Sequence, residues 1–135
     1  LAADDAAGLS VLYPTADFAS STAVLSGQVT GPDGQGRRLV SVVAISPNGG
    51  VVSALTAPDG SYSIQGLPPA TYIIYAHPLP PATQPGLGPA DIVLPTDDTG
   101  TAFDASEPVE TQFYGGGKNA NFSVSVVVRA GQSSA

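Results

Sequence analysis

The sequence predicts an all-β protein, a sandwich of about seven strands preceded by one short helix. Sixteen glycines and thirteen prolines divide the 135 residues into short segments. Between them lie runs rich in Val, Ile and Thr, the residues that suit a pleated sheet. The chain is long enough for one domain with its own core, and it contains no cysteine. That core, and not disulfide bonds, must therefore stabilise the fold.

Residues 1–14 (LAADDAAGLSVLYP) predict a short helical leader. Alanine favours the helix, Asp4 and Asp5 suit its amino end, and Pro14 ends it. A helix this short is marginal in water, so it must dock on another element. We expect its buried stripe to consist of three larger apolar residues, Leu9, Leu12 and Tyr13.

Residues 15–24 are small and polar and indicate a linker, after which a β module is expected over residues 25–132. Runs of β-branched and aromatic residues between turn signals mark its strands. We expect strands at residues 25–30, 39–46, 51–57, 61–64, 71–75, 110–114 and 121–129, with 91–94 as a candidate edge strand. In the strand at 121–129, alternation places four apolar residues on one face, Phe122, Val124, Val126 and Val128.

Turn signals separate these strands. In Pro58-Asp59-Gly60, proline presets φ, the Asp59 side chain can bond its own backbone, and Gly60 accepts the positive φ that closes the turn. The residues Gly31-Pro32-Asp33-Gly34 form a second turn, and Pro47-Asn48-Gly49-Gly50 predicts a hairpin. We expect Tyr72 to be a corner tyrosine that bonds nearby backbone.

The leader carries a first resemblance. Its pattern Asp-Asp-x-x-Gly-Leu-x-x-Leu-Tyr-Pro, residues 4–14, resembles the end of the catalytic domain in matrixin-type zinc metallopeptidases. The resemblance implies that a protease domain lies upstream of this chain. The zinc motif of that family is absent here, and His77, the only histidine, cannot build a catalytic zinc site alone.

The β module carries a second resemblance, over about residues 25–78. It resembles the carboxypeptidase regulatory-like family, which includes the collagen-adhesin B-type repeats. The residues that carry the likeness are Gly27, Asp59-Gly60-Ser61-Tyr62, Leu67-Pro68-Pro69 and Thr71-Tyr72. The family usually has Gly where Ala70 stands, so in this chain either that position needs no positive φ or the turn differs slightly. The resemblance implies a transthyretin-like, Ig-like Greek-key sandwich.

A Pro-rich, acidic insertion is expected at residues 78–110, and it raises the question of a metal. Six acids and no base lie between Asp91 and Glu110. Calcium takes carboxylate oxygen ligands, and the candidates are Asp97, Asp98, Asp104 and Glu107. The alternative is a solvated acidic loop, because no dense Asp-x-Asp-x-Asp spacing is present.

The composition excludes several classes of function. The net charge is −7, with four Lys and Arg residues against eleven acids. Four scattered bases cannot form a nucleic-acid interface or an electrostatic membrane anchor, and no apolar run reaches the roughly 20 residues of a membrane span. A single histidine and no cysteine leave no set of nucleophile, base and orienting group. We therefore expect neither nucleic acid nor membrane insertion, and no enzyme in this chain.

Two binding roles remain open beside a structural one. Exposed aromatics bind sugar rings, and Phe113 and Tyr114 are the candidate platform for a polysaccharide. The ending Arg129-Ala130-Gly131-Gln132 resembles the turn after which this family normally adds a strand. A sandwich without that strand has an unpaired edge, which is a template for a homo-oligomer by strand addition; the alternative is that the missing strand belongs to the same polypeptide.

The sequence as a whole predicts a non-catalytic accessory module of a secreted, extracellular bacterial protein. Its partners are expected to be neighbouring domains of the same polypeptide, one of them the metallopeptidase domain. A self-assembling structural subunit and a carbohydrate-binding module are the alternatives.

Overall fold

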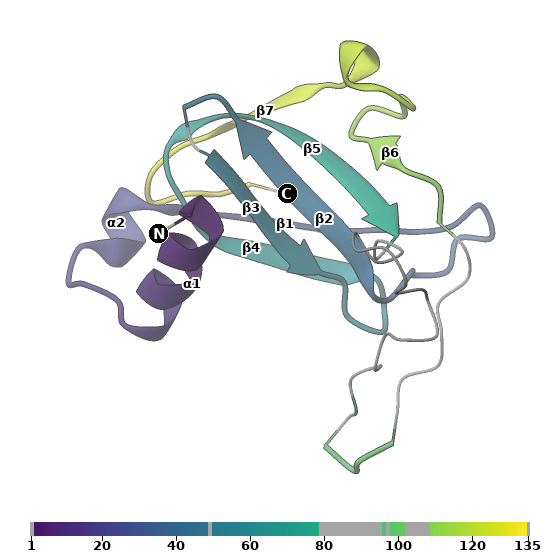
Figure 1. Ribbon diagram of the computed structural model, residues 1–135, viewed down its shortest axis with the longest axis horizontal. Helices are drawn as coiled ribbons and strands as arrows, with labels where there is room; N and C mark the ends of the chain where they lie inside the picture. Colours follow the sequence, from purple (N-terminus) through teal and green to yellow (C-terminus); the bar gives the residue numbers. More distant parts are fainter. Residues whose placement is uncertain (1, 49, 79–95, 97, 102–108, 135) are drawn as a thin grey trace, which may run out of the picture.

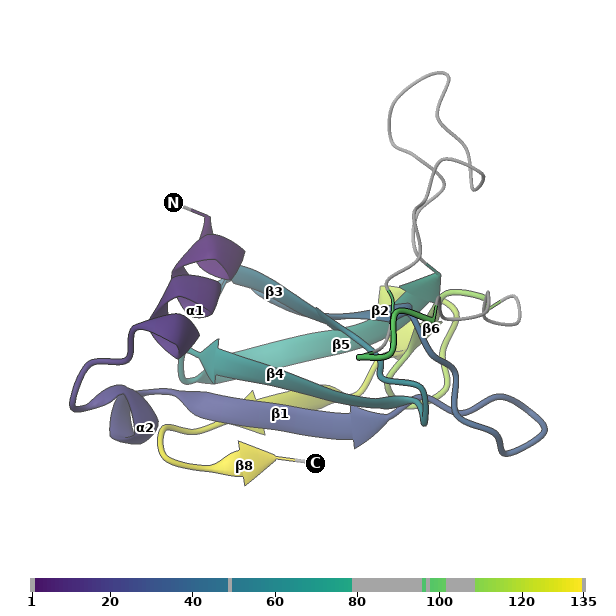
Figure 2. The ribbon, with the colours of Figure 1, turned by 90° about the horizontal axis from the view of Figure 1, so that it is seen from below.

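The computed structural model describes residues 2–48, 50–78, 96, 98–101 and 109–134. In this part of the chain, a short N-terminal helix lies against two β-sheets that face each other (Figures 1 and 2). The elements are α1 Ala3–Leu12, α2 Phe18–Ser21, β1 Ala23–Gln28, β2 Val40–Ser46, β3 Gly50–Leu55, β4 Ser61–Leu67, β5 Ala70–Pro78, β6 Gln112–Phe113, the 3₁₀ helix η2 Ala120–Phe122, β7 Ser125–Val128 and β8 Ser133–Ser134. The expectation of a mostly β protein with an N-terminal helix is confirmed.

The two sheets have the strand orders β4-β1-β8 and β3-β2-β5-β6, and β7 also pairs with β5. Among the described residues, the strand pairings are antiparallel except the one between β1 and β8. The hairpin expected at residues 47–50 joins β2 to β3, with Ser46 opposite Gly50. The region that was predicted to be a linker, residues 15–24, contains α2 and the first two residues of β1.

The core lies between the sheets and is built from small aliphatic side chains around one aromatic ring. Strand alternation brings its residues inward from both sheets: Leu25, Val42, Ala44, Val52, Ile64, Leu67, Tyr72, Ile74 and Val128. Tyr72 is fully buried, and its hydroxyl donates to the carbonyl oxygen of Pro68 at 2.9 Å. The prediction of a corner tyrosine is confirmed.

The turn that contains Pro58-Asp59-Gly60 forms as expected. The Ala57 N–H donates to Ser61 O, the Gly60 N–H donates to Ala57 O, and Gly60 has a φ of +83°. The Asp59 carboxylate accepts from the Ser61 N–H at 2.9 Å. Among the described residues, the positive-φ residues do not include Ala70, which agrees with the first of the two alternatives for that position.

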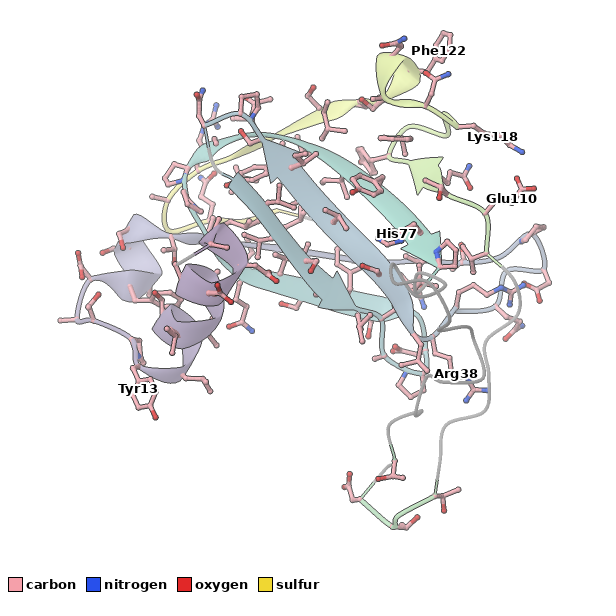
Figure 3. All side chains as sticks on the ribbon, viewed as in Figure 1. Tyr13, Arg38, His77, Glu110, Lys118 and Phe122 are labelled. Carbon is pink, nitrogen blue, oxygen red and sulfur yellow. The ribbon has the colours of Figure 1, made fainter. Side chains whose placement is uncertain are left out.

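The predicted buried stripe of the leader helix was wrong. Leu9, Leu12 and Tyr13 are 47%, 72% and 78% exposed, and the Tyr13 ring points away from the sheets (Figure 3). The buried residue of α1 is Ala7. The helix approaches β3 and β4 at two glycines, and only small side chains leave room for so close a contact.

The predicted last strand was also wrong in its first half. Residues 120–122 form η2, and β7 begins only at Ser125. The Asn119 side chain accepts from the Asn121 N–H at 3.1 Å and so caps a turn that competes with the strand. Phe122 is 71% exposed at this turn (Figure 3), and only Val126 and Val128 face the core. The strand expected at 110–114 is likewise reduced to the two residues of β6.

The edge expected to be empty is occupied in part by the chain itself. The residues of β8 run parallel to β1, with Ser133 opposite Val24 and Ser134 opposite Leu25. The other side of β1 is paired with β4 along most of its length. The candidate edge strand at 91–94 lies outside the described residues.

Candidate functional site

A cavity of about 220 Å³ opens between the two sheets, at the end away from α1. Its inner wall is apolar and consists of core residues of the large sheet, Val42, Ile74 and Ala76. Polar side chains come from the other elements around it: Gln28 of β1, Tyr62 of β4, Gln112 of β6 and Tyr114 directly after β6. The cavity therefore combines an apolar wall with polar groups from both sheets.

Most of these polar groups have hydrogen-bonding capacity to spare. The Gln28 Nε2 donates to Asp59 O at 2.7 Å, which leaves the Gln28 Oε1 as a further acceptor. Within the described part of the chain, no hydrogen bond engages the Tyr62 or Tyr114 hydroxyl or the Gln112 side-chain amide. Burial raises the pKa of Tyr62, and the nearby Tyr114 raises it to a smaller extent. The Tyr62 phenol thus stays neutral and able to donate at physiological pH.

An aromatic row lies beside the cavity on β5 and β6. Tyr75 stacks on His77 with the ring centroids 5.6 Å apart, and contacts Phe113 at 5.2 Å. The His77 Nδ1 is 2.7 Å from Pro78 O, so the proton on this nitrogen points at a carbonyl oxygen. The contacts of His77 are therefore with its own strand, at the end of β5, as its position just before Pro78 indicates.

A second hollow, of about 570 Å³, lies on the outer face of the large sheet. Cross-strand neighbours line it, with Ile45 opposite both Val51 and Ile73. Tyr75 and Phe113 line this hollow as well as the cavity between the sheets. It offers a large apolar surface but few groups that could orient a polar ligand.

A third hollow, of about 430 Å³, lies where α1 meets the sheets. Val11 and Leu12 of the helix line one side, and Val52 and Ile64 of β3 and β4 line the other. Leu12, which was expected to be buried, therefore borders this open hollow together with Val11.

The two predicted platform residues both lie near the cavity, but the Phe113 ring packs on Tyr75, its cross-strand partner on β5. Phe113 is half-buried and Tyr114 is 50% exposed, and both line the cavity between the sheets. Ring contacts within the described residues join Phe113 to Tyr75 but not to Tyr114. The sequence reasoning missed Gln28, Tyr62 and Gln112. Gln112 had one available signal, because it directly precedes the predicted platform.

The calcium prediction falls largely outside the described residues. Asp97, Asp104 and Glu107 are not among them, and Asp98 is exposed. In the ranges that the structure describes, no three His, Cys, Asp or Glu side chains gather as metal ligands would. The calcium site remains a prediction.

Comparison with protein-family models, curated proteins and solved structures finds no match to this chain. None of the helices in the described residues is long and apolar enough to cross a membrane.

Proposed function

We propose that this chain is a non-catalytic accessory module of a secreted bacterial protein, which holds a neighbouring domain in a fixed position. One observation carries the proposal. The helix α1 is attached to the sheets through its smallest side chains, while its larger apolar side chains remain open to contact.

The attachment of α1 is close and specific. A Cβ on Gly50 would lie 2.5 Å from the Ala3 Cβ, and one on Gly66 would lie 3.3 Å from Ala7 O. The Asp4 carboxylate accepts from the Ser53 N–H at 3.1 Å, 49 residues away in sequence. Such contacts fix the position of a helix that would be marginal alone. A domain joined to it would be held relative to the sheets.

The exposed side of α1 suits contact with such a domain. Leu9, Leu12 and Tyr13 form part of the segment that resembles the end of a matrixin-type metallopeptidase domain. Exposed apolar side chains that lie close together are typical of contact sites. In this proposal they pack against the preceding catalytic domain, and the present chain performs no catalysis.

We also propose the finer fold class, a transthyretin-like Greek-key sandwich. The neighbours β1 and β4, and β2 and β5, are not consecutive in sequence, which supports this winding. The resemblance to the carboxypeptidase regulatory-like family supports it from the sequence. An extracellular location is consistent with an acidic chain without cysteine.

The accessory role is tested in the natural polypeptide that contains this chain. Hydrogen exchange at residues 9–13 is compared between that polypeptide and residues 1–135 alone. The proposal expects slower exchange in the longer protein, and a lower melting temperature of the neighbouring domain when Leu12→Ala and Tyr13→Ala are combined. Phe122→Ala is the control, because Phe122 is exposed on a distant turn. Equal exchange in both proteins would refute the role.

Assembly by strand addition is the second candidate, and the edge of β1 favours it. β8 pairs with Val24 and Leu25, whereas β1 continues to Gln28. A strand edge with unpaired backbone groups is a template for another chain. Light scattering over a range of concentrations tests this, with oligomers expected. A protein that remains monomeric at millimolar concentration would exclude assembly by strand addition.

A further inference from the structure

The cavity between the two sheets has the chemistry of a binding site, which the accessory role does not require. Polar side chains reach it from separate parts of the chain: Gln28, Tyr62, Gln112 and Tyr114. The first two come from the small sheet, and the other two from the region around β6. An apolar wall with several convergent polar groups is typical of a pocket that binds a small ligand.

The charges around the cavity restrict the ligand. No Asp, Glu, Lys, Arg or His is among the described residues that line it. The chain as a whole has a net charge of −7, which repels anions. A metal cation would need carboxylate ligands, and the polar side chains of the lining are amides, phenols and the Thr30 hydroxyl. The ligand is therefore neutral.

The hydrogen-bonding groups restrict the ligand further. An amide both donates and accepts, and a neutral phenol does the same. These groups suit a ligand that carries several hydroxyl groups. The wall of Val42, Ile74 and Ala76 and the ring of Tyr114 suit a ligand that also has an apolar face. A pyranose ring has both, with hydroxyls at its rim and C–H groups on its faces.

The size of the cavity agrees with one ring. A protein cavity of about 150 Å³ holds benzene, so the 220 Å³ found here accommodates one six-membered ring with substituents. The larger hollow at Ile45 and Val51 is a poorer sugar site, because its lining offers few partners for hydroxyl groups.

We propose that the cavity binds a single neutral pyranose unit of a polysaccharide. Tyr114, half exposed at the mouth, covers one face of the sugar ring. The side chains of Gln28, Tyr62 and Gln112 bind its hydroxyls. The site is independent of the accessory role, since it lies at the end of the sheets away from α1.

The experiment is a titration of the ¹⁵N-labelled chain with neutral hexoses, 6-deoxyhexoses and N-acetylhexosamines, followed by ¹H–¹⁵N NMR. The expected result is saturable shifts for at least one sugar, centred on the backbone at residues 28, 62, 112 and 114 and on the glutamine side-chain amides. Tyr114→Ala is expected to weaken binding about tenfold. Gln112→Ala, at an exposed position, is a second variant, and Phe122→Ala is the matched control.

Three results would overturn the proposal. The first is that no sugar binds even at a 100-fold molar excess over a protein concentration of about 1 mM, where weak binding of a single sugar ring would still be seen. The shifts centre on Ile45 and Val51 instead of the cavity. Binding in Tyr114→Ala and Gln112→Ala, each with a folded spectrum, equals binding in Phe122→Ala. A proline-rich peptide is titrated in parallel, because aromatic-lined grooves also bind such segments, and shifts at the cavity from this peptide alone would be a fourth contradicting result.

Discussion

The Tyr62 ring lies directly over Gly27 on the neighbouring strand. The two residues are cross-strand partners of β4 and β1. A Cβ on Gly27 would be 2.7 Å from the Tyr62 Oη and 2.9 Å from two ring carbons. The strand therefore uses glycine because the ring occupies the space of a side chain, a known way to stabilise glycine in a sheet. The same ring lines the cavity between the sheets.

Gly27→Ala is expected to destabilise the protein by about 1 kcal/mol. Overpacking against the Tyr62 ring costs about 1–3 kcal/mol, whereas replacing glycine in a strand returns about 0.5–1 kcal/mol. Urea unfolding measures the difference. In a Tyr62→Ala background the clash is absent, so the same substitution should become neutral or stabilising. The control is Gly8→Ala, where no atom lies within 4 Å and a small gain is expected.

The Thr56 hydroxyl holds the chain on both sides of a strained residue. Leu39 has a φ of +55°, the one positive value at a non-glycine residue within the described ranges. The Thr56 Oγ1 donates to Arg37 O at 2.5 Å and accepts from the Val40 N–H at 3.0 Å. These bonds secure the backbone before and after Leu39, at a site that is buried.

Thr56→Val is therefore expected to lower the free energy of unfolding by about 1–3 kcal/mol, because a buried N–H loses its partner at constant side-chain shape. Thr56→Ser keeps the hydroxyl and should recover most of that loss. Thr71→Val, at an exposed strand position, serves as the control for the change in residue type. Equal unfolding midpoints for the Thr56 and Thr71 valine variants would contradict the assigned role.

The sequence predicted best what short-range chemistry decides. The turn around Asp59 depends on neighbours within four residues, and the same hydrogen-bond pattern recurs around Asp33. Tyr72 reaches Pro68, only four residues back. The side of α1 that is buried depends instead on the distant glycines of β3 and β4, which the leader itself does not reveal.

The candidate site divides in the same way. Phe113 and Tyr114 could be found as neighbouring aromatics in one segment. Gln28 and Tyr62 could not, because they reach the same cavity only through the pairing of β1 with β4 and the packing of the two sheets. The strand prediction was wrong at residues 121–124 for a further reason, because apolar alternation does not reveal a competing cap such as Asn119.

Ala7→Leu is expected to detach α1 from the sheets. Ala7 is buried against Gly66, where even one added Cβ would lie at 3.3 Å, so a leucine side chain has no room. Amide hydrogen exchange at residues 3–12 should become fast, while exchange in β2 and β5 stays slow. Ala6→Leu is the matched control, because Ala6 is exposed on the same helix. Unchanged protection of α1 in Ala7→Leu would show that the helix docks otherwise.

The Asp59 turn should make stability depend on acid pH. The Ser61 hydroxyl and the Ser61 N–H donate to the Asp59 carboxylate at 2.6 and 2.9 Å, and these bonds lower its pKa. A carboxyl whose folded pKa lies below its unfolded value of about 3.9 stabilises the fold above that value. The stabilisation is lost as the pH falls through the folded pKa.

Asp59→Asn removes this titration while keeping a side-chain oxygen that can accept from Ser61. The variant should melt below the parent at pH 7. The two melting temperatures should converge as the pH falls below about 4, because the Asp59 carboxyl of the parent then becomes protonated. Ser61→Ala removes the hydroxyl donor and should show the same trend, whereas Ser63→Ala, exposed on β4, should not. A gap between parent and Asp59→Asn that persists unchanged at pH 2 would mean that the charge of Asp59 does not stabilise the turn.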